Sequence, residues 1–198
     1  TSPEKLTAAL RRGLPHVCLI SGDEPLQAGE AADSIRAAAR AAGYTEREVF
    51  FIDRANSGPW DEIFASAQAL SLFAARRVLE IRIPGSKPGT QGAAALQELA
   101  GLAGADLLLL VITGELDWTA QKAGWVQALD AAGLWVDAAQ VPLARFPEWL
   151  KGRAAALDLT LDDEAVQSLA LQCEGNLLAA SQELTKLQLA GHREVGAG

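Results

Sequence analysis

Five short apolar segments alternate with longer helical stretches over residues 1–140, and this alternation limits the possible folds more than any other feature. The five segments are Val17 to Ile20, Val49 to Ile52, Val78 to Ile83, Leu107 to Ile112, and Leu134 to Val136. Strands separated by helices pair in parallel, because each helix carries the chain back to the edge where the sheet began. The pattern predicts an α/β domain with a mostly parallel five-stranded sheet and flanking helices.

The strand candidates differ in how much of their surface they can bury. Leu107 to Ile112 is apolar at every position, which is typical of a central strand covered on both faces. In Val78 to Ile83, Glu80 and Arg82 alternate with apolar residues. We therefore expect one face of this third strand to be partly exposed.

The strand pattern stops after Pro142. Three consecutive helices are predicted from the apolar spacing that follows, at Phe146 to Leu157, Asp162 to Cys173, and Asn176 to Ala190. We expect residues 1–140 to form the α/β domain and residues 141–198 to form a small helical domain.

Composition restricts the class of protein. The chain has 198 residues and is 49% hydrophobic, enough for one large core or a core with a small second domain. No apolar run approaches the roughly 20 residues that cross a bilayer, and Thr1 to Arg12 lacks the order of a secretion signal. We expect a globular protein of the cytoplasm with no membrane contact.

The net charge of -8 argues against autonomous binding to nucleic acid. Affinity for a phosphate backbone comes mainly from clustered Lys and Arg side chains. Arg76 and Arg77 are adjacent cations before a strand, and such pairs usually lie at a solvated edge. Any contact with DNA is expected to be indirect.

The turn after the first strand lies where a nucleotide-binding α/β domain holds phosphate. A phosphate-binding loop needs several glycines, a Lys, and a Ser or Thr for magnesium. Asp23 and Glu24 would instead repel phosphate, and neither Lys nor Thr occurs from Ser21 to Ala32. We expect Asp23 or its neighbour to cap the next helix, with Pro25 in its first turn. The prediction is no bound cofactor and no ATP hydrolysis by this chain alone.

Other candidates for chemistry are weak. Carboxylates follow strand ends at Asp53, Glu115 and Asp117, but most such residues cap helices or remain solvated, so we expect no metal site. Cys18 and Cys173 lie in separate apolar segments and are expected to be reduced core thiols.

No catalytic arrangement is indicated. His16 and His192 lie near opposite ends of the chain, and neither belongs to a nucleophile–base motif. Most of the five tryptophans are expected in cores, Trp118 least so because it follows a polar loop. We assign no catalytic residues.

Trp60 to Phe73 is predicted to be an amphipathic helix with two misplaced apolar side chains. The core-facing stripe consists of Trp60, Ile63, Phe64 and Ala67. At about 100° per residue, Leu72 and Phe73 fall roughly 120° to 140° from the centre of that stripe. Two alternatives remain open: the following strand bends back to cover them, or they contact a partner protein.

Three segments, taken in order, carry a resemblance to a known family. They are Leu19 to Leu26 (LISGDEPL), Gln68 to Ala74 (QALSLFA), and Glu174 to Ala180 (EGNLLAA) with Glu183-Leu184 and Lys186-Leu187 after it. Together they closely resemble the delta subunit of bacterial DNA polymerase III, from about Ser2 to Ala190.

The resemblance implies a clamp-loader subunit with an AAA+-like α/β domain, a small helical lid domain and a C-terminal collar domain. We expect this chain to end before the collar domain. Its glycine-rich ending, Gly191 to Gly198, and its lack of Met lead us to expect that the natural protein continues.

The resemblance also implies a role and a site. In the family an apolar tip docks into a hydrophobic pocket on the ring-shaped sliding clamp, the beta subunit, and helps to open the ring. Leu72 and Phe73 correspond to this plug, and Leu70, where relatives can carry Met, supports it. The family's delta subunit lacks a working ATP site.

The expected assembly is the clamp loader of the replicative holoenzyme, a DNA-directed DNA polymerase and hence a nucleotidyltransferase. Partner subunits, gamma/tau and delta prime, would supply ATP hydrolysis, and this chain would be non-catalytic by itself. Two rival hypotheses are a small nucleotide-using α/β enzyme and a purely structural AAA+-like scaffold in which Leu72 and Phe73 are core residues.

Overall fold

A computed structural model describes residues 1–55, 58–69 and 76–196. The chain divides into two compact units, Thr1–Ala139 and Gln140–Gly198, each of which is described by itself. Among the described residues, no helix combines the length and the apolar character needed to cross a membrane.

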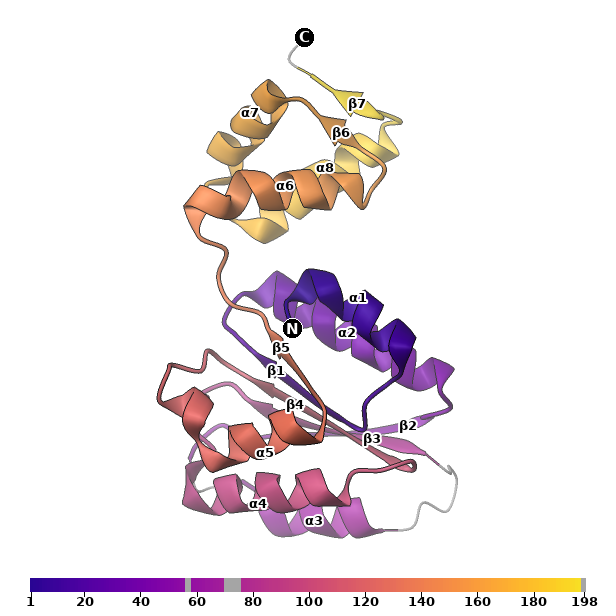
Figure 1. Ribbon diagram of the computed structural model, residues 1–198, viewed down its shortest axis with the longest axis vertical. Helices are drawn as coiled ribbons and strands as arrows, with labels where there is room; N and C mark the ends of the chain where they lie inside the picture. The colour runs from indigo at the N-terminus through magenta and orange to yellow at the C-terminus, as the bar shows by residue number, and fades with distance from the viewer. Residues whose placement is uncertain (56–57, 70–75, 197–198) are drawn as a thin grey trace. The chain divides into compact units, whose positions relative to one another are not determined.

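The first unit is built around a five-stranded sheet in which every neighbouring pair is parallel (Figure 1). Its strands are β1 (Val17–Ser21), β2 (Glu46–Phe51), β3 (Arg77–Ile83), β4 (Leu107–Thr113) and β5 (Leu134–Asp137). Their order across the sheet is β2-β3-β4-β1-β5, which places β2 and β5 at the two edges. The predicted parallel sheet is confirmed.

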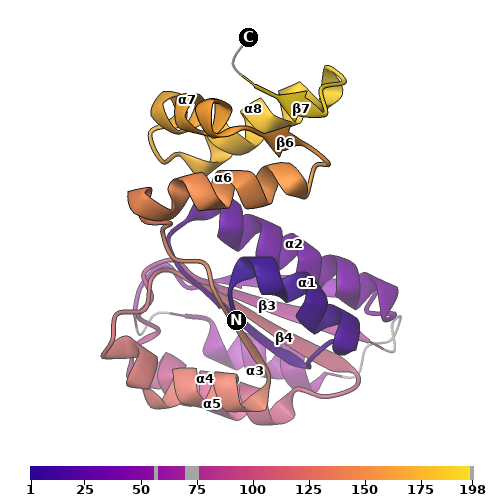
Figure 2. The ribbon, with the colours of Figure 1, turned by 45° about the horizontal axis from the view of Figure 1, so that its top comes forward.

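Helices cover both faces of this sheet (Figure 2). They are α1 (Pro3–Arg12), α2 (Pro25–Ala41), α3 (Trp60–Gln68), α4 (Gly89–Leu102) and α5 (Gly124–Ala132). Helices α1 and α2 lie on one face, and α3, α4 and α5 lie on the other. Consecutive βαβ crossovers place helices on both sides of a parallel sheet in this way.

Two hydrophobic cores result, one on each face. Along β1, Val17 and Leu19 enter the core under α3–α5, whereas Cys18 and Ile20 enter the core under α1 and α2. Strand β4 alternates in the same manner, and it is buried from its first residue to Val111. The prediction of a central strand covered on both faces is confirmed.

Strand β2 begins at Glu46, three residues before the predicted start at Val49. Its first residues are charged, and the apolar pattern therefore missed them. An edge strand tolerates such residues because one of its sides faces solvent.

The second unit contains the three predicted helices, α6 (Phe146–Ala155), α7 (Asp163–Cys173) and α8 (Leu177–Leu189). Asp162 caps α7 by accepting a hydrogen bond from the Ala165 N–H, and Asn176 caps α8 through the Ala179 N–H. A short parallel pair, β6 (Thr160–Leu161) and β7 (Glu194–Val195), was not predicted. Two-residue strands are too short to produce a period-2 pattern.

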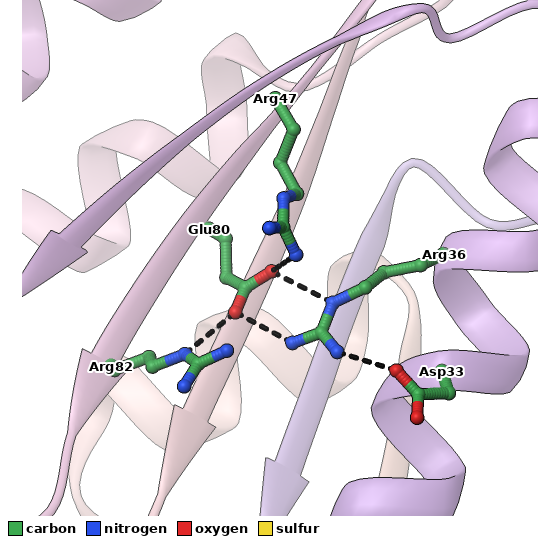
Figure 3. Close-up of polar contacts among 5 residues, drawn as sticks. All are labelled: Asp33, Arg36, Arg47, Glu80 and Arg82. Carbon is green, nitrogen blue, oxygen red and sulfur yellow. Dashed lines mark hydrogen bonds and ion pairs between the residues drawn. The ribbon is translucent and has the colours of Figure 1, made fainter.

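Glu80 in β3 is fully buried, which corrects the expectation that it lies on an exposed face. Figure 3 shows the arginines that contact its carboxylate. Arg36 from α2 contacts both of its oxygens, Nη2 to Oε1 at 2.7 Å and Nε to Oε2 at 3.0 Å. Arg82 Nε lies 2.7 Å from Oε1, and Arg47 Nη1 from β2 lies 3.3 Å from Oε2. Asp33 also binds Arg36 at 2.7 Å. The expectation holds for Arg82, whose side chain is 37% exposed.

These contacts keep Glu80 ionised. Burial opposes its charge, but hydrogen bonds from Arg36 and Arg82 and their charges outweigh burial, and the pKa of Glu80 lies below its ordinary value of 4.5. A carboxylate whose pKa is lower in the folded state stabilises the fold above its ordinary pKa. That contribution is lost as the pH falls through the lowered value.

Replacing Glu80 with Gln tests this reading. The variant leaves Arg36 without its buried counter-charge, and we expect the free energy of unfolding at pH 7 to fall by roughly 3 kcal/mol, the low end for a broken buried pair, because Arg47 and Arg82 reach solvent. Urea denaturation at pH 7 and at a series of pH values below 4.5 measures the difference, which should shrink as the pH falls. Glu98→Gln, at an exposed position of α4, is the matched control. Equal stability of Glu80→Gln and wild type at pH 7 would contradict the assignment.

Candidate functional site

The predicted clamp-binding residues Leu70, Leu72 and Phe73 lie outside the described residues. The structure does describe the chain on both sides of segment 70–75, from α3 to Ala69 and from Arg76 onward. On one side are the end of α3 and Ala69, and on the other side are Arg76 and the start of β3 at Arg77. We call these flanking residues the neck.

Helix α3 gives the neck a packed foundation. Trp60 and Ile63 are buried in the core under α3–α5, and Phe64 and Ala67 pack against the same core. The predicted apolar stripe is therefore confirmed.

Helix α3 ends at Gln68, which corrects the prediction that it continues to Phe73. Ala69 is already extended, with φ -63° and ψ 135°. The reason is a side chain from β3: Arg77 Nη2 donates to Ala67 O at 3.1 Å and to Ala69 O at 2.5 Å. The last carbonyls of a helix lack partners within the helix, and here a guanidinium supplies them.

Arg76 fixes the other side of the neck. Its Nη1 donates to Ala42 O at 2.7 Å, and its guanidinium lies 5.8 Å from the centre of the Tyr44 ring. The Tyr44 hydroxyl donates to Ala105 O at 3.0 Å. Burial raises the pKa of Tyr44 and outweighs the opposing charge of Arg76, so the hydroxyl stays a donor.

Backbone hydrogen bonds complete this frame. The Arg77 N–H donates to Asp106 O at 2.9 Å, and the Thr45 N–H donates to Arg76 O at 3.2 Å. The residues on both sides of segment 70–75 are thus hydrogen-bonded to neighbouring elements near the N-terminal end of β3. The described chain on each side of segment 70–75 is therefore anchored to neighbouring backbone.

The sequence predicted a solvated edge for Arg76 and Arg77 and missed this role. Both guanidinium groups donate to backbone carbonyls of residues that come earlier in the chain. Arg77 binds carbonyls at the end of α3, and Arg76 binds the carbonyl of Ala42. The available signal was a cation near the C-terminal end of a predicted helix, where carbonyls need donors. The misplaced helix end obscured that signal.

The turn after β1 lies at the C-terminal ends of the strands, opposite the neck. Backbone of the segment after β5 fills the space beside this turn. Gly22 has φ +135°, and a Cβ there would meet Ala138 O at 2.1 Å. The Glu24 N–H donates to this same carbonyl at 3.2 Å, and the Ala138 N–H donates to Ser21 O at 2.6 Å. The glycine is thus needed for close approach to the segment after β5.

A carboxylate occupies the helix terminus where a phosphate would bind. Glu24 is buried and caps α2 by accepting a hydrogen bond from the Gln27 N–H at 2.6 Å, and Pro25 is in the first turn. The predicted cap by Asp23 or its neighbour is confirmed, with Glu24 in that role. The Ser21 hydroxyl accepts a hydrogen bond from Trp135 Nε1 at 2.8 Å.

The carboxylates after the strands have structural or solvated positions. Asp117 caps a 3₁₀ turn (Ala120–Lys122) by accepting from the N–H groups of Thr119 and Ala120 at 2.9 and 2.7 Å. Asp53 and Glu115 are exposed. Within residues 1–55, 58–69 and 76–196, no three His, Cys, Asp or Glu side chains are grouped to hold a metal ion.

Two other sequence expectations concern Trp118 and the cysteines. Trp118 is 72% exposed, as anticipated, with Lys122 Nζ 3.2 Å from its ring centre. Cys18 and Cys173 are free and buried. Burial raises the pKa of Cys18 to about 12, so its thiol stays protonated and unreactive.

Comparison with known proteins gives one consistent family. Residues 18–139 match the family described as "DNA polymerase III, delta subunit". The chain is 38% identical over 187 residues to the DNA polymerase III subunit delta of Escherichia coli K12. It is 30% identical over 190 residues to the protein of that name from Haemophilus influenzae.

Each of these alignments covers 94% of this chain and 54% of the relative, so the chain spans about half the length of both relatives. A solved structure, the Bacillus subtilis DNA clamp loader delta protein, superposes with a TM-score of 0.73 at 18% identity, covering 98% of this chain and 59% of that one. At this identity the likeness supports the fold, and the predicted AAA+-like class is confirmed.

The neck leads to a prediction about Arg77. Arg77→Ala removes the donor that holds Ala67 O and Ala69 O, and we expect the free energy of unfolding to fall by roughly 1.5 kcal/mol, the low end for hydrogen bonds to charged groups. Amide hydrogen exchange should accelerate at Ala69, whose N–H donates to Ala65 O at the end of α3. Urea denaturation and exchange measured by NMR check both effects. Arg12→Ala, at an exposed position, is the control, and unchanged exchange at Ala69 would refute the role of Arg77.

Proposed function

The chain belongs to the DNA polymerase III delta-subunit family, and we propose that it binds the sliding clamp through segment 70–75 and helps to open the ring. Leu72 and Phe73 are the proposed plug, and Leu70 supports them. Residues 1–140 would be the clamp-binding domain and residues 141–198 the lid domain. The partners proposed are the clamp, gamma/tau and delta prime, acting together in the cytoplasm.

The observation that carries this proposal is the neck. A segment that exerts force on another protein must be attached to a rigid part of its own chain. Arg77 and Arg76 provide such an attachment, because they hydrogen-bond backbone carbonyls next to both ends of segment 70–75. We propose that α3, which ends at Gln68, acts as a rigid lever and that the plug is the part of the lever that holds the clamp.

The proposed contact is large enough to matter. Burying Leu72 and Phe73 completely would contribute roughly 3 to 6 kcal/mol gross, at about 1.5 to 3 kcal/mol for each side chain. To open a ring, however, the contact must favour the open or distorted state, because equal affinity for two states shifts no population. The proposed mechanism is therefore differential binding.

We also propose that this chain is non-catalytic and binds no nucleotide. The Glu24 carboxylate caps α2 where a phosphate would lie, and Ala138 O sits against Gly22. ATP hydrolysis would come from partner subunits, and contact with DNA would be indirect.

The proposed function leads to a prediction about the plug. Leu72→Ala combined with Phe73→Ala removes most of the proposed buried area, and a loss of about 3 kcal/mol corresponds to roughly 100-fold weaker binding. Isothermal titration of the 198-residue chain into the sliding clamp of the same organism measures the dissociation constant. Circular dichroism establishes that the double variant remains folded.

A matched control is Leu171→Ala with Leu189→Ala, two exposed leucines of the second unit. This control should bind the clamp with the wild-type dissociation constant. Clamp binding by the plug variant within twofold of wild type would overturn the proposed site.

The proposed function also leads to a prediction about nucleotide. Because a carboxylate fills the helix terminus, equilibrium dialysis with ATP and magnesium should give no saturable binding to this chain. An ATP-hydrolysing subunit of the same loader, dialysed in parallel, provides the positive control. Saturable binding at one site per chain would favour the rival hypothesis of a nucleotide-using enzyme.

A further inference from the structure

The two edge strands of the main sheet differ in whether another part of the chain hydrogen-bonds to their outer side. At the β5 edge, the Asp137 N–H donates to Thr1 O at 2.9 Å, and the Thr1 amino group donates to Trp135 O at 2.7 Å. At the other edge, β2 pairs with β3 on its inner side and has no second strand neighbour in the described part of the chain. Strand β2 thus offers backbone donors and acceptors along its outer side.

The side chains beside this edge carry fixed positive charge. Arg47 and Arg82 are 46% and 37% exposed, and each contacts the buried Glu80 through one nitrogen (Figure 3). Their remaining N–H groups lie outside these contacts with Glu80. Holding a guanidinium at one end reduces the rotamer entropy that it loses when it binds a carboxylate.

An apolar surface lies next to these charges. Phe51 at the end of β2 is 55% exposed, and the Arg82 guanidinium lies 5.4 Å from its ring centre. Phe51 and Arg82 are register partners across β2 and β3. Residues 47, 49 and 51 point to the same face of β2, because side chains alternate along a strand.

The charge balance favours an acidic segment over nucleic acid. Arg36, Arg47 and Arg82 against Asp33 and Glu80 give three positive and two negative charges, a surplus of one, in a chain of net charge -8. Glu46 and Glu48 lie on the opposite face of β2 from Arg47, so neither faces a carboxylate paired with that arginine. Together with Asp53 they would repel a continuous phosphate backbone, which passes along the whole edge, more than a segment with a single carboxylate. One or two carboxylates on a peptide match this surface better.

We propose that β2 is a docking edge for an extended acidic segment of a partner protein, which adds a strand to the sheet. An acidic side chain of the segment pairs with Arg47, and an apolar side chain packs on Phe51 beside Arg82. Main-chain hydrogen bonds to β2 provide affinity, and these two side chains provide specificity. The residues that make up this site, Arg47, Phe51 and Arg82, do not belong to segment 70–75.

The geometry fixes the spacing of the recognised pattern. Arg47 and Phe51 are four residues apart on one strand, which corresponds to about 13 Å. A segment lying alongside therefore carries its acidic and apolar residues four positions apart. The intervening same-face residue lies beside Val49, which is partly buried, and should be small or β-branched.

The test is a selection of random nine-residue peptides displayed on phage against the 198-residue chain at low salt. We expect enriched sequences with Asp or Glu four positions from an aliphatic or aromatic residue. Fluorescence anisotropy with a synthetic enriched peptide should show at least tenfold weaker binding to Arg47→Glu and to Phe51→Ser. N-methylation of the peptide amides that face β2 should abolish binding, whereas methylation of the outward amides should not.

Arg145→Glu and Leu171→Ser are the matched controls, since both residues are exposed in the second unit, and their binding should equal that of wild type. Thermal melts establish that all four variants are folded. The proposal is overturned if no enriched peptide depends on both Arg47 and Phe51, or if binding survives N-methylation of every amide. It is also overturned if single-stranded oligothymidylate competes for the edge more strongly than the peptides do.

Discussion

Burial of the sheet on both faces is the constraint on which the rest of the first unit depends. Strand β4 sends alternate side chains into the two cores, and a strand covered in this way has no freedom to shift its register. Because all five strands are parallel, all their N-terminal ends lie on one side of the sheet and all their C-terminal ends on the opposite side. The neck lies at the N-terminal ends of the strands, and the turn capped by Glu24 lies at their C-terminal ends. Two regions with different chemistry are thereby kept apart by the length of the strands.

At the C-terminal ends of the strands, the turn after β1 connects a strand to a helix without the Lys and the Ser or Thr of a phosphate-binding loop. The helix terminus after β1 still requires an acceptor for its free N–H groups, and Glu24 supplies one from within the chain. Gly22 keeps its positive φ because the Ala138 carbonyl approaches there. The turn is stabilised by the chain's own groups, and its geometry is consistent with a structural role.

The sequence was sufficient for features that depend on local periodicity. The apolar runs located all five strands, and the spacing of Trp60, Ile63, Phe64 and Ala67 identified the buried stripe of α3. It was insufficient where a distant side chain decides the outcome. Glu80 is buried because Arg36, 44 positions earlier, meets it from α2, and α3 ends at Gln68 because Arg77 binds its last carbonyls. The plug residues Leu70, Leu72 and Phe73 stay a prediction, since they lie outside the described residues.

Strand β3 links the neck to the buried charge cluster. Arg77 begins the strand and holds the end of α3, and Glu80 lies three residues further along. Arg36 joins Glu80 to α2 and Arg47 joins it to β2, while Arg82 contacts it from β3 itself. In the proposed function, a pull on segment 70–75 is transmitted to β3, which is hydrogen-bonded to β2 and β4 on its two sides. To move β3 along its axis would break both ladders and the Glu80 contacts together. Under the proposed function, a plug with such a base would transfer its binding free energy to the partner ring, because deforming the subunit itself would be the more costly alternative.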